Sequence, residues 1–170
     1  MSQFLPAFNY TMGYEDPART WLPLTDNNGY PVIAGINGKW FPQVVKKLLA
    51  LAPADRLSTI QGFYQAAFWL NLGLACIASQ DIASRVFDQS VNGGPFSAIQ
   101  MLQQCCTEDG ETVAEDGRMG TITCTAVNSV DGEKLLAQYR DAREAHYRGI
   151  AEHNPADMPY LDGWLARARG

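Results

Sequence analysis

The chain has 170 residues, of which 46% are hydrophobic and 18% charged, a balance that indicates a globular domain and excludes a disordered chain. Its net charge of −5 and its scattered basic residues argue against nucleic acid as a partner. The four cysteines lack the spacing of metal ligands, so we expect buried free thiols, no metal site and no cofactor.

The first predicted helix covers residues 2–15. Phe4, Phe8 and Met12 recur every four residues and form an apolar stripe, which Glu15 continues at the C-terminal end. Apolar surroundings and the partial negative charge of a helix C-terminus both favour the neutral, protonated form of a carboxyl group. A general acid needs this form, so Glu15 is the candidate catalytic acid, with a solvated surface carboxylate as the alternative interpretation.

Residues 16–38 interrupt the helical pattern with three prolines and three glycines. The turn signal Asp26-Asn27-Asn28-Gly29 predicts a small, irregular β-hairpin or a long loop. A glycosidase uses a second carboxylate to activate water or to attack the sugar, and Asp26 is the candidate for this role. An Asx turn, in which the Asp side chain only stabilises the backbone, is an equal alternative for Asp26.

The remainder of the chain has a mainly helical pattern. The predicted helices cover residues 41–51, 54–70, 80–92, 94–105, 121–128, 131–153 and 157–168, with a polar loop at 109–120. The sequence therefore predicts a mainly α fold with a small β element. We expect one domain over residues 1–170, with an N-terminal catalytic lobe (1–80) and a C-terminal helical lobe (81–170). The apolar run at 66–77 is too short for stable membrane insertion.

Several segments resemble glycoside hydrolase family 108, the phage-type N-acetylmuramidases also called secretion activator proteins. The first helix of that family ends in Glu-Gly-Gly-Tyr, with the catalytic Glu, where this chain has Tyr14-Glu15-Asp16-Pro17. The family's following loop resembles Asp26-Asn27-Asn28-Gly29 and Ala34-Gly35-Ile36-Asn37. Further signatures follow in family order and resemble a peptidoglycan-associated region: Phe87 to Gly94, Leu102-Gln103, Asp116 to Gly120, His146 to Ile150, Asn154-Pro155 and Tyr160 to Arg167. The chain departs from the family at Asp16-Pro17, which replaces Gly-Gly, and at Asn37, which replaces Thr.

The resemblance implies a lysozyme-like fold in which the β element lies beside the substrate cleft. It implies a muramidase that cleaves the β-1,4 bond between N-acetylmuramic acid and N-acetylglucosamine, with Glu15 as the acid. The expected substrate-binding residues are Asn37, Trp69, Asp88 and Asn92, and Asp88, one helical turn before Asn92, would brace the same region. Asn92 would bind an N-acetyl group through its amide, and a helix cap is the alternative. Trp69 would form an aromatic platform for a sugar, and a place in the core is the alternative.

Two other functions agree with the same residues. A lytic transglycosylase would use Glu15 without a second carboxylate, because a hydroxyl group of the sugar closes an anhydro ring. A non-catalytic peptidoglycan-binding or secretion-associated protein would account for the altered residues after Glu15. The expected partner is bacterial peptidoglycan, with a holin, a secretion system or an immunity protein as candidate protein partners. Because no signal peptide is visible, we expect synthesis in the cytoplasm and action in the periplasm or on the cell wall after release.

Overall fold

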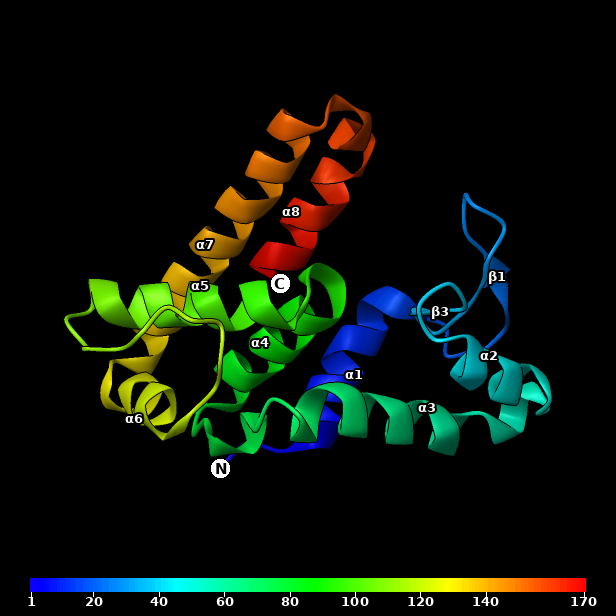
Figure 1. Ribbon diagram of the computed structural model, residues 1–170, viewed down its shortest axis with the longest axis horizontal. Coiled ribbons are helices and arrows are strands. Elements are labelled where there is room, and N and C mark those ends of the chain that lie inside the picture. Colours follow the sequence, from blue (N-terminus) through cyan, green and yellow to red (C-terminus); the bar gives the residue numbers. More distant parts are fainter.

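The computed structural model describes residues 1–170 and is mainly helical (Figure 1). The α-helices are α1 (Phe4–Glu15), α2 (Pro42–Leu49), α3 (Leu57–Tyr64), α4 (Gln80–Gly93), α5 (Pro95–Glu108), α6 (Thr121–Ser129), α7 (Gly132–His153) and α8 (Leu161–Arg169). Shorter helical segments are η1 (Pro53–Asp55), η2 (Gln65–Leu70), η3 (Leu74–Cys76) and η4 (Pro155–Tyr160). None of the helices combines the length and the apolar character that crossing a membrane requires.

A small antiparallel sheet is formed between α1 and α2. Its strands are β1 (Leu24–Thr25), β2 (Pro31–Ile33) and β3 (Ile36–Asn37), paired in the order β1-β2-β3. The predicted fold class, mainly α with a small β element, is confirmed. The division into lobes of residues 1–80 and 81–170 stays a prediction.

The start of α1 differs from the sequence prediction. The helix begins at Phe4 and not at residue 2, and the Ser2 hydroxyl donates to the carbonyl oxygen of Leu74 at 2.9 Å. The backbone N–H of Ser2 also donates, to the carbonyl oxygen of Ile77 at 3.0 Å. Ser2 is buried, and a buried hydroxyl is stable only with a hydrogen-bond partner. Its two hydrogen bonds therefore hold the N-terminal segment against η3.

The apolar stripe of α1 forms part of the core. Phe4, Phe8 and Met12 are all buried, as the four-residue spacing predicts. Phe4 meets Phe87 of α4 edge to face, with the ring centroids 6.0 Å apart. Because this packing fixes the rotation of α1, Glu15 emerges on the side of the helix that faces the rest of the protein.

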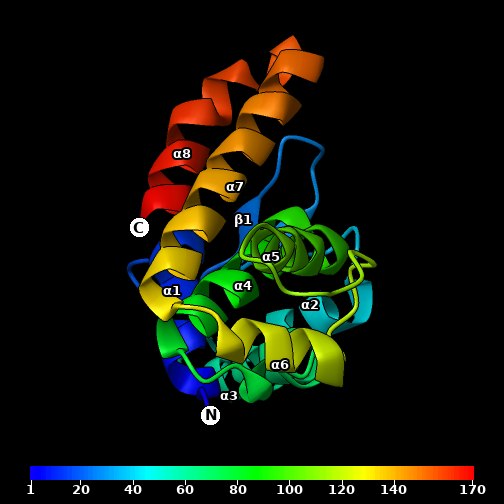
Figure 2. The same cartoon turned by 90° about the vertical axis from the view of Figure 1, so that its left-hand side faces the viewer.

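The last two helices form a hairpin that returns the chain to the end of α1. Figure 2 shows α7 and α8 side by side, and Figure 1 shows the C-terminus of α8 close to α4 and α1. The helix α7 begins at Gly132 because the Asp131 carboxylate accepts the backbone N–H of Lys134 at 2.8 Å and so caps the helix. The sheet lies beyond the end of α1, so this helix end has α8 as one neighbour and the sheet as another.

Candidate active site at the end of helix α1

Glu15 is the last residue of α1 and contacts two distant parts of the chain. Its Oε1 accepts a hydrogen bond from Nη2 of Arg167 at 2.8 Å, and its side chain is 18% exposed. Its Oε2 lies against the turn between β2 and β3, since a Cβ atom added to Gly35 would lie only 2.5 Å from it. The carboxylate is therefore held between α8 and the sheet but can still be reached from solvent.

The two residues that depart from the family motif end the helix. Asp16 has φ −151° and lies outside the helix, which agrees with the bias against helical conformation in the residue before Pro17. The Asp16 carboxylate accepts the backbone N–H groups of Thr20 at 3.2 Å and Trp21 at 2.7 Å. Asp16-Pro17 therefore ends the helix and turns the chain back after Glu15.

Arg167 supplies a positive charge next to Glu15. Its Nε and Nη2 donate to the carboxylate of Asp88 at 2.8–3.1 Å, and its guanidinium lies 5.0 Å from the ring centroid of Tyr14. Burial by itself would lower the pKa of Arg167, but the hydrogen bonds and charges of Asp88 and Glu15 raise it above its ordinary value. Arg167 is thus a permanent cation.

The apolar environment that the sequence predicts for Glu15 is therefore only part of its surroundings. The apolar stripe ends at Met12, and a cation 152 residues away in the sequence pairs with the carboxyl group instead. An opposite charge at hydrogen-bond distance favours the ionised form of a carboxyl group.

A closed ring of hydrogen bonds holds Arg167 in place. Its six side chains come from three helices: Asp88, Gln89 and Asn92 of α4, Arg143 and Tyr147 of α7, and Arg167 of α8. Asp88 and Arg143 form its most buried ion pair, with a distance of 2.6 Å and both side chains fully buried. Buried charges of this kind persist only when they are paired and hydrogen-bonded, so the ring fixes the guanidinium rigidly.

The turn between β2 and β3 forms the other wall beside Glu15. The hydroxyl of Tyr64 donates to the carbonyl oxygen of Ala34 at 2.7 Å. Burial raises the pKa of Tyr64 well above its ordinary value, and the negative charge of Glu15 raises it further, so Tyr64 remains a hydrogen-bond donor. Ala34 and Gly35 both have positive φ angles, 49° and 77°, which brings the backbone close to Glu15.

If Glu15 is the catalytic acid that the resemblance implies, we expect Gly35→Ala to reduce activity on cell walls roughly 100-fold, because the new methyl group would displace Glu15 from its position. Gly29→Ala is the matched control: Gly29 also has a positive φ of 84°, but a Cβ atom there would touch nothing within 4 Å. In both variants backbone strain should lower the free energy of unfolding, measured in urea, by about 1–2 kcal/mol. Equal activities of the two variants would show that the contact with Glu15 is unimportant.

Asp26 forms an Asx turn at the tip of the sheet. Its Oδ1 accepts the backbone N–H groups of Asn28 at 2.9 Å and Tyr30 at 2.8 Å, and its Oδ2 accepts Nδ2 of Asn37 at 2.8 Å. The hydrogen bond from Asn37, followed by that from Tyr30, holds the pKa of Asp26 below its ordinary value. The Asx-turn interpretation is confirmed, while a catalytic role of Asp26 stays a prediction. Asn37, which lies two residues after Gly35, binds Asp26 through its side-chain amide.

Two predicted substrate-binding residues are buried. Trp69 is only 3% exposed and packs against Phe4 and Phe87, each ring centroid 6.1 Å away, so its prediction as a sugar platform is wrong and the core alternative is right. Asp88 is fully buried and cannot contact a sugar directly, so it acts by bracing Arg167. Asn92, in contrast, is exposed, and binding of a ligand by its amide stays a prediction.

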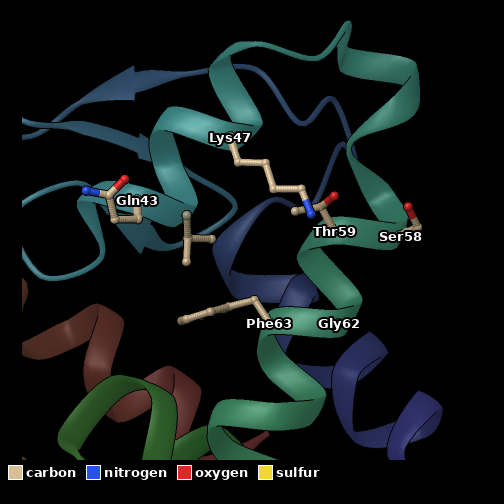
Figure 3. A pocket seen from close by; sticks show the side chains of 7 residues that line it. Gln43, Lys47, Ser58, Thr59, Gly62 and Phe63 are labelled. Carbon is tan, nitrogen blue, oxygen red and sulfur yellow. The ribbon is translucent and has the colours of Figure 1, made fainter.

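A separate pocket of about 490 Å³ opens between α2 and α3 (Figure 3). Its lining is Gln43, Val44, Lys47, Ser58, Thr59, Gly62 and Phe63. None of the catalytic or substrate-binding residues that the sequence predicts lines this pocket. The candidate active site around Glu15 is therefore a different place from this pocket.

No curated protein matches this chain. Residues 97–169 match a family model described as "Predicted Peptidoglycan domain". The whole chain resembles the solved structure of Brucella abortus SagA with a TM-score of 0.72 and 20% sequence identity, over 98% of this chain and 89% of that chain. At this identity the likeness to SagA shows a shared fold alone.

The matched segment supports an association of this protein with peptidoglycan. It spans most of α5 and all of α6 and α7, and it ends at the last residue of α8. Arg143 and Arg167 lie within it, whereas Glu15 and Asp88 lie outside. The salt bridge between Arg167 and Glu15 therefore joins the peptidoglycan-associated segment to the candidate acid.

Proposed function

We propose that the protein is an N-acetylmuramidase that cleaves the β-1,4 bond between N-acetylmuramic acid and N-acetylglucosamine in peptidoglycan. The observation that carries the proposal is the position of Glu15, partly exposed at the end of α1 and paired with a segment that matches a predicted peptidoglycan domain. The resemblance of the residues around Glu15 to glycoside hydrolase family 108 supports it further. Its place of action would be the periplasm or the cell wall, reached through a holin or a secretion system.

In this proposal Glu15 protonates the glycosidic oxygen as the bond breaks. The carboxylate that remains is stabilised by Arg167, at 2.8 Å, so the ion pair favours the state in which the proton has been given away. Arg167 divides its charge between Glu15 and Asp88, and Asp88 also pairs with Arg143. Two carboxylates thus face two guanidinium groups, and the four charges sum to zero.

The second step distinguishes two enzymes. In a hydrolase, Asp26 would orient or activate the water, for which its ionised form is suitable. Three hydrogen bonds already occupy the two oxygens of Asp26, and this observation favours a lytic transglycosylase as the second candidate. A transglycosylase needs only Glu15, because the sugar's own hydroxyl attacks.

Digestion of purified cell walls tests the proposal. We expect wild-type protein to release muropeptides with new reducing ends, identified by mass spectrometry and by a reducing-sugar assay. Products lighter by one water molecule and without new reducing ends would identify the transglycosylase. Sedimentation of the protein with the walls, without any new chain ends, would reject both enzymes and identify a peptidoglycan-binding protein.

A further inference from the structure

We propose that Arg167 is a positioning residue for Glu15, which fixes the carboxyl group against the β2–β3 turn and holds a positive charge beside it. The inference rests on the proposed function, because it assigns a task in the same site. It goes beyond that function because Arg167 lies on α8, within the segment that matches the predicted peptidoglycan domain. This segment would then help to position the catalytic acid.

The contacts of Arg167 show that it is fixed independently of Glu15. Its Nε contacts both carboxylate oxygens of Asp88 at 3.1 and 3.0 Å, and its Nη2 contacts Asp88 again at 2.8 Å. Its Nη1 donates to Oδ1 of Asn92 at 3.3 Å. Glu15 accepts a single hydrogen bond from it. Glu15 can therefore release or regain its proton while Arg167 stays in place on Asp88.

The other groups around Glu15 cannot replace this cation. Asp88 of α4 is an anion and is separated from Glu15 by the guanidinium that both share. Tyr64 of α3 is neutral, and its hydroxyl donates to Ala34. Tyr14 of α1 has no cationic group and faces Arg167 with its ring. Loss of the positive charge at position 167 should therefore favour the protonated form of Glu15.

A second contact of the C-terminal segment with the sheet supports a coupling between the two parts of the chain. The Tyr160 hydroxyl, next to the start of α8, accepts a hydrogen bond from Nδ2 of Asn27 at 3.2 Å. The C-terminal segment thus contacts the N-terminal part of the chain at two points, through Tyr160 just before α8 and through Arg167 near the end of α8. The position of α8 determines where the guanidinium meets Glu15.

Three variants separate charge from structure at this position. Arg167→Gln removes the cation, and the fold should tolerate it because the buried Asp88 keeps its neutral pair with Arg143. Arg167→Lys retains the positive charge. Arg169→Gln is the matched control, because Arg169 lies on the same helix and forms an exposed salt bridge with Glu144 at 2.7 Å. Circular dichroism and thermal unfolding would establish that each variant is folded.

The measurements are a carbon-13 NMR titration of the Glu15 carboxyl group and the pH profile of wall cleavage. In Arg167→Gln we expect Glu15 to take up its proton at a pH higher by about one unit or more, and the alkaline limb of the activity profile to move in the same direction. Arg167→Lys should restore most of the wild-type titration. Arg169→Gln should match wild type in both measurements.

The NMR titration separates this inference from the proposed function. An unchanged Glu15 titration in folded Arg167→Gln would overturn the inference, whatever the activity. Equal titrations of the Gln and Lys variants would also overturn it, because the positive charge would then have no effect. A shifted titration in a protein that never cleaves cell walls would support the inference about Arg167 while rejecting the muramidase.

Discussion

Glu15→Gln is expected to abolish the clearing of purified cell walls, with a loss of rate of at least about 100-fold, the usual lower bound for removal of a general acid. The amide has nearly the same shape as the carboxyl group, and its oxygen can still accept the hydrogen bond from Arg167 that is seen at 2.8 Å. It has no acidic proton to donate to the glycosidic oxygen. Loss of turbidity, together with release of muropeptides, measures the effect.

Glu144→Gln is the control for this variant. Glu144 also pairs with arginine, at 2.7 Å from Arg169 and 3.6 Å from Arg148, but it lies on α7 and contacts neither Glu15 nor Arg167. We expect wild-type clearing from it. Sedimentation with cell walls should be equal for both variants and wild type, since neither change removes the segment that matches the peptidoglycan domain. Full activity of Glu15→Gln would eliminate Glu15 as the acid.

Local periodicity accounts for the parts of the fold that could be predicted. The spacing of Phe4, Phe8 and Met12 identifies the buried face of α1, and it also places Glu15 at the end of that face. The turn signal at Asp26 correctly predicts a tight turn, because an Asx turn depends on hydrogen bonds between neighbouring residues. Such features are determined within a few residues of the chain and can be recognised in its sequence.

The partners of Glu15 could not be predicted in this way. Arg167 and Arg143 lie far from Glu15 and Asp88 in the sequence, and helical periodicity does not state which helices pack together. A usable signal was present in α8: Arg167 falls between the buried residues Leu165 and Ala168, so a charge lies on the apolar side of that helix. A buried arginine of this kind requires hydrogen-bond acceptors, and a carboxylate is the acceptor that also balances its charge.

The error at Trp69 has a different cause. Aromatic residues at helical spacing are found both in cores and in sugar-binding grooves, and the spacing is the same in both cases. The neighbours of the ring distinguish them, and here these are Phe4 and Phe87. Asp88 presents the same difficulty, since only its contacts with two arginines show that it braces the site from inside the protein.

The hydrogen-bonded ring makes Asp88→Asn the variant with the largest expected loss of stability. Removal of this charge leaves Arg143 fully buried without an anion, and the new amide group would direct N–H donors at a guanidinium. We expect the free energy of unfolding to fall by about 3–5 kcal/mol, measured by urea denaturation. Asp81→Asn on the same helix is the control: its side chain is 72% exposed, its pair with Arg85 spans 3.5 Å, and its removal should cost less than about 1 kcal/mol.

A double variant distinguishes two causes of this loss of stability: an uncompensated charge left on Arg143, or the loss of the favourable interaction between Asp88 and Arg143. If the cost of Asp88→Asn arises mainly from the uncompensated charge, then addition of Arg143→Met should recover part of the stability, because the second change removes the isolated cation. The coupling free energy between positions 88 and 143 should then be large compared with that between Asp81 and Arg85. Additive losses at positions 88 and 143 would contradict this account and would assign the stability of the ring to its other hydrogen bonds, such as that from Tyr147 to Gln89 at 2.8 Å.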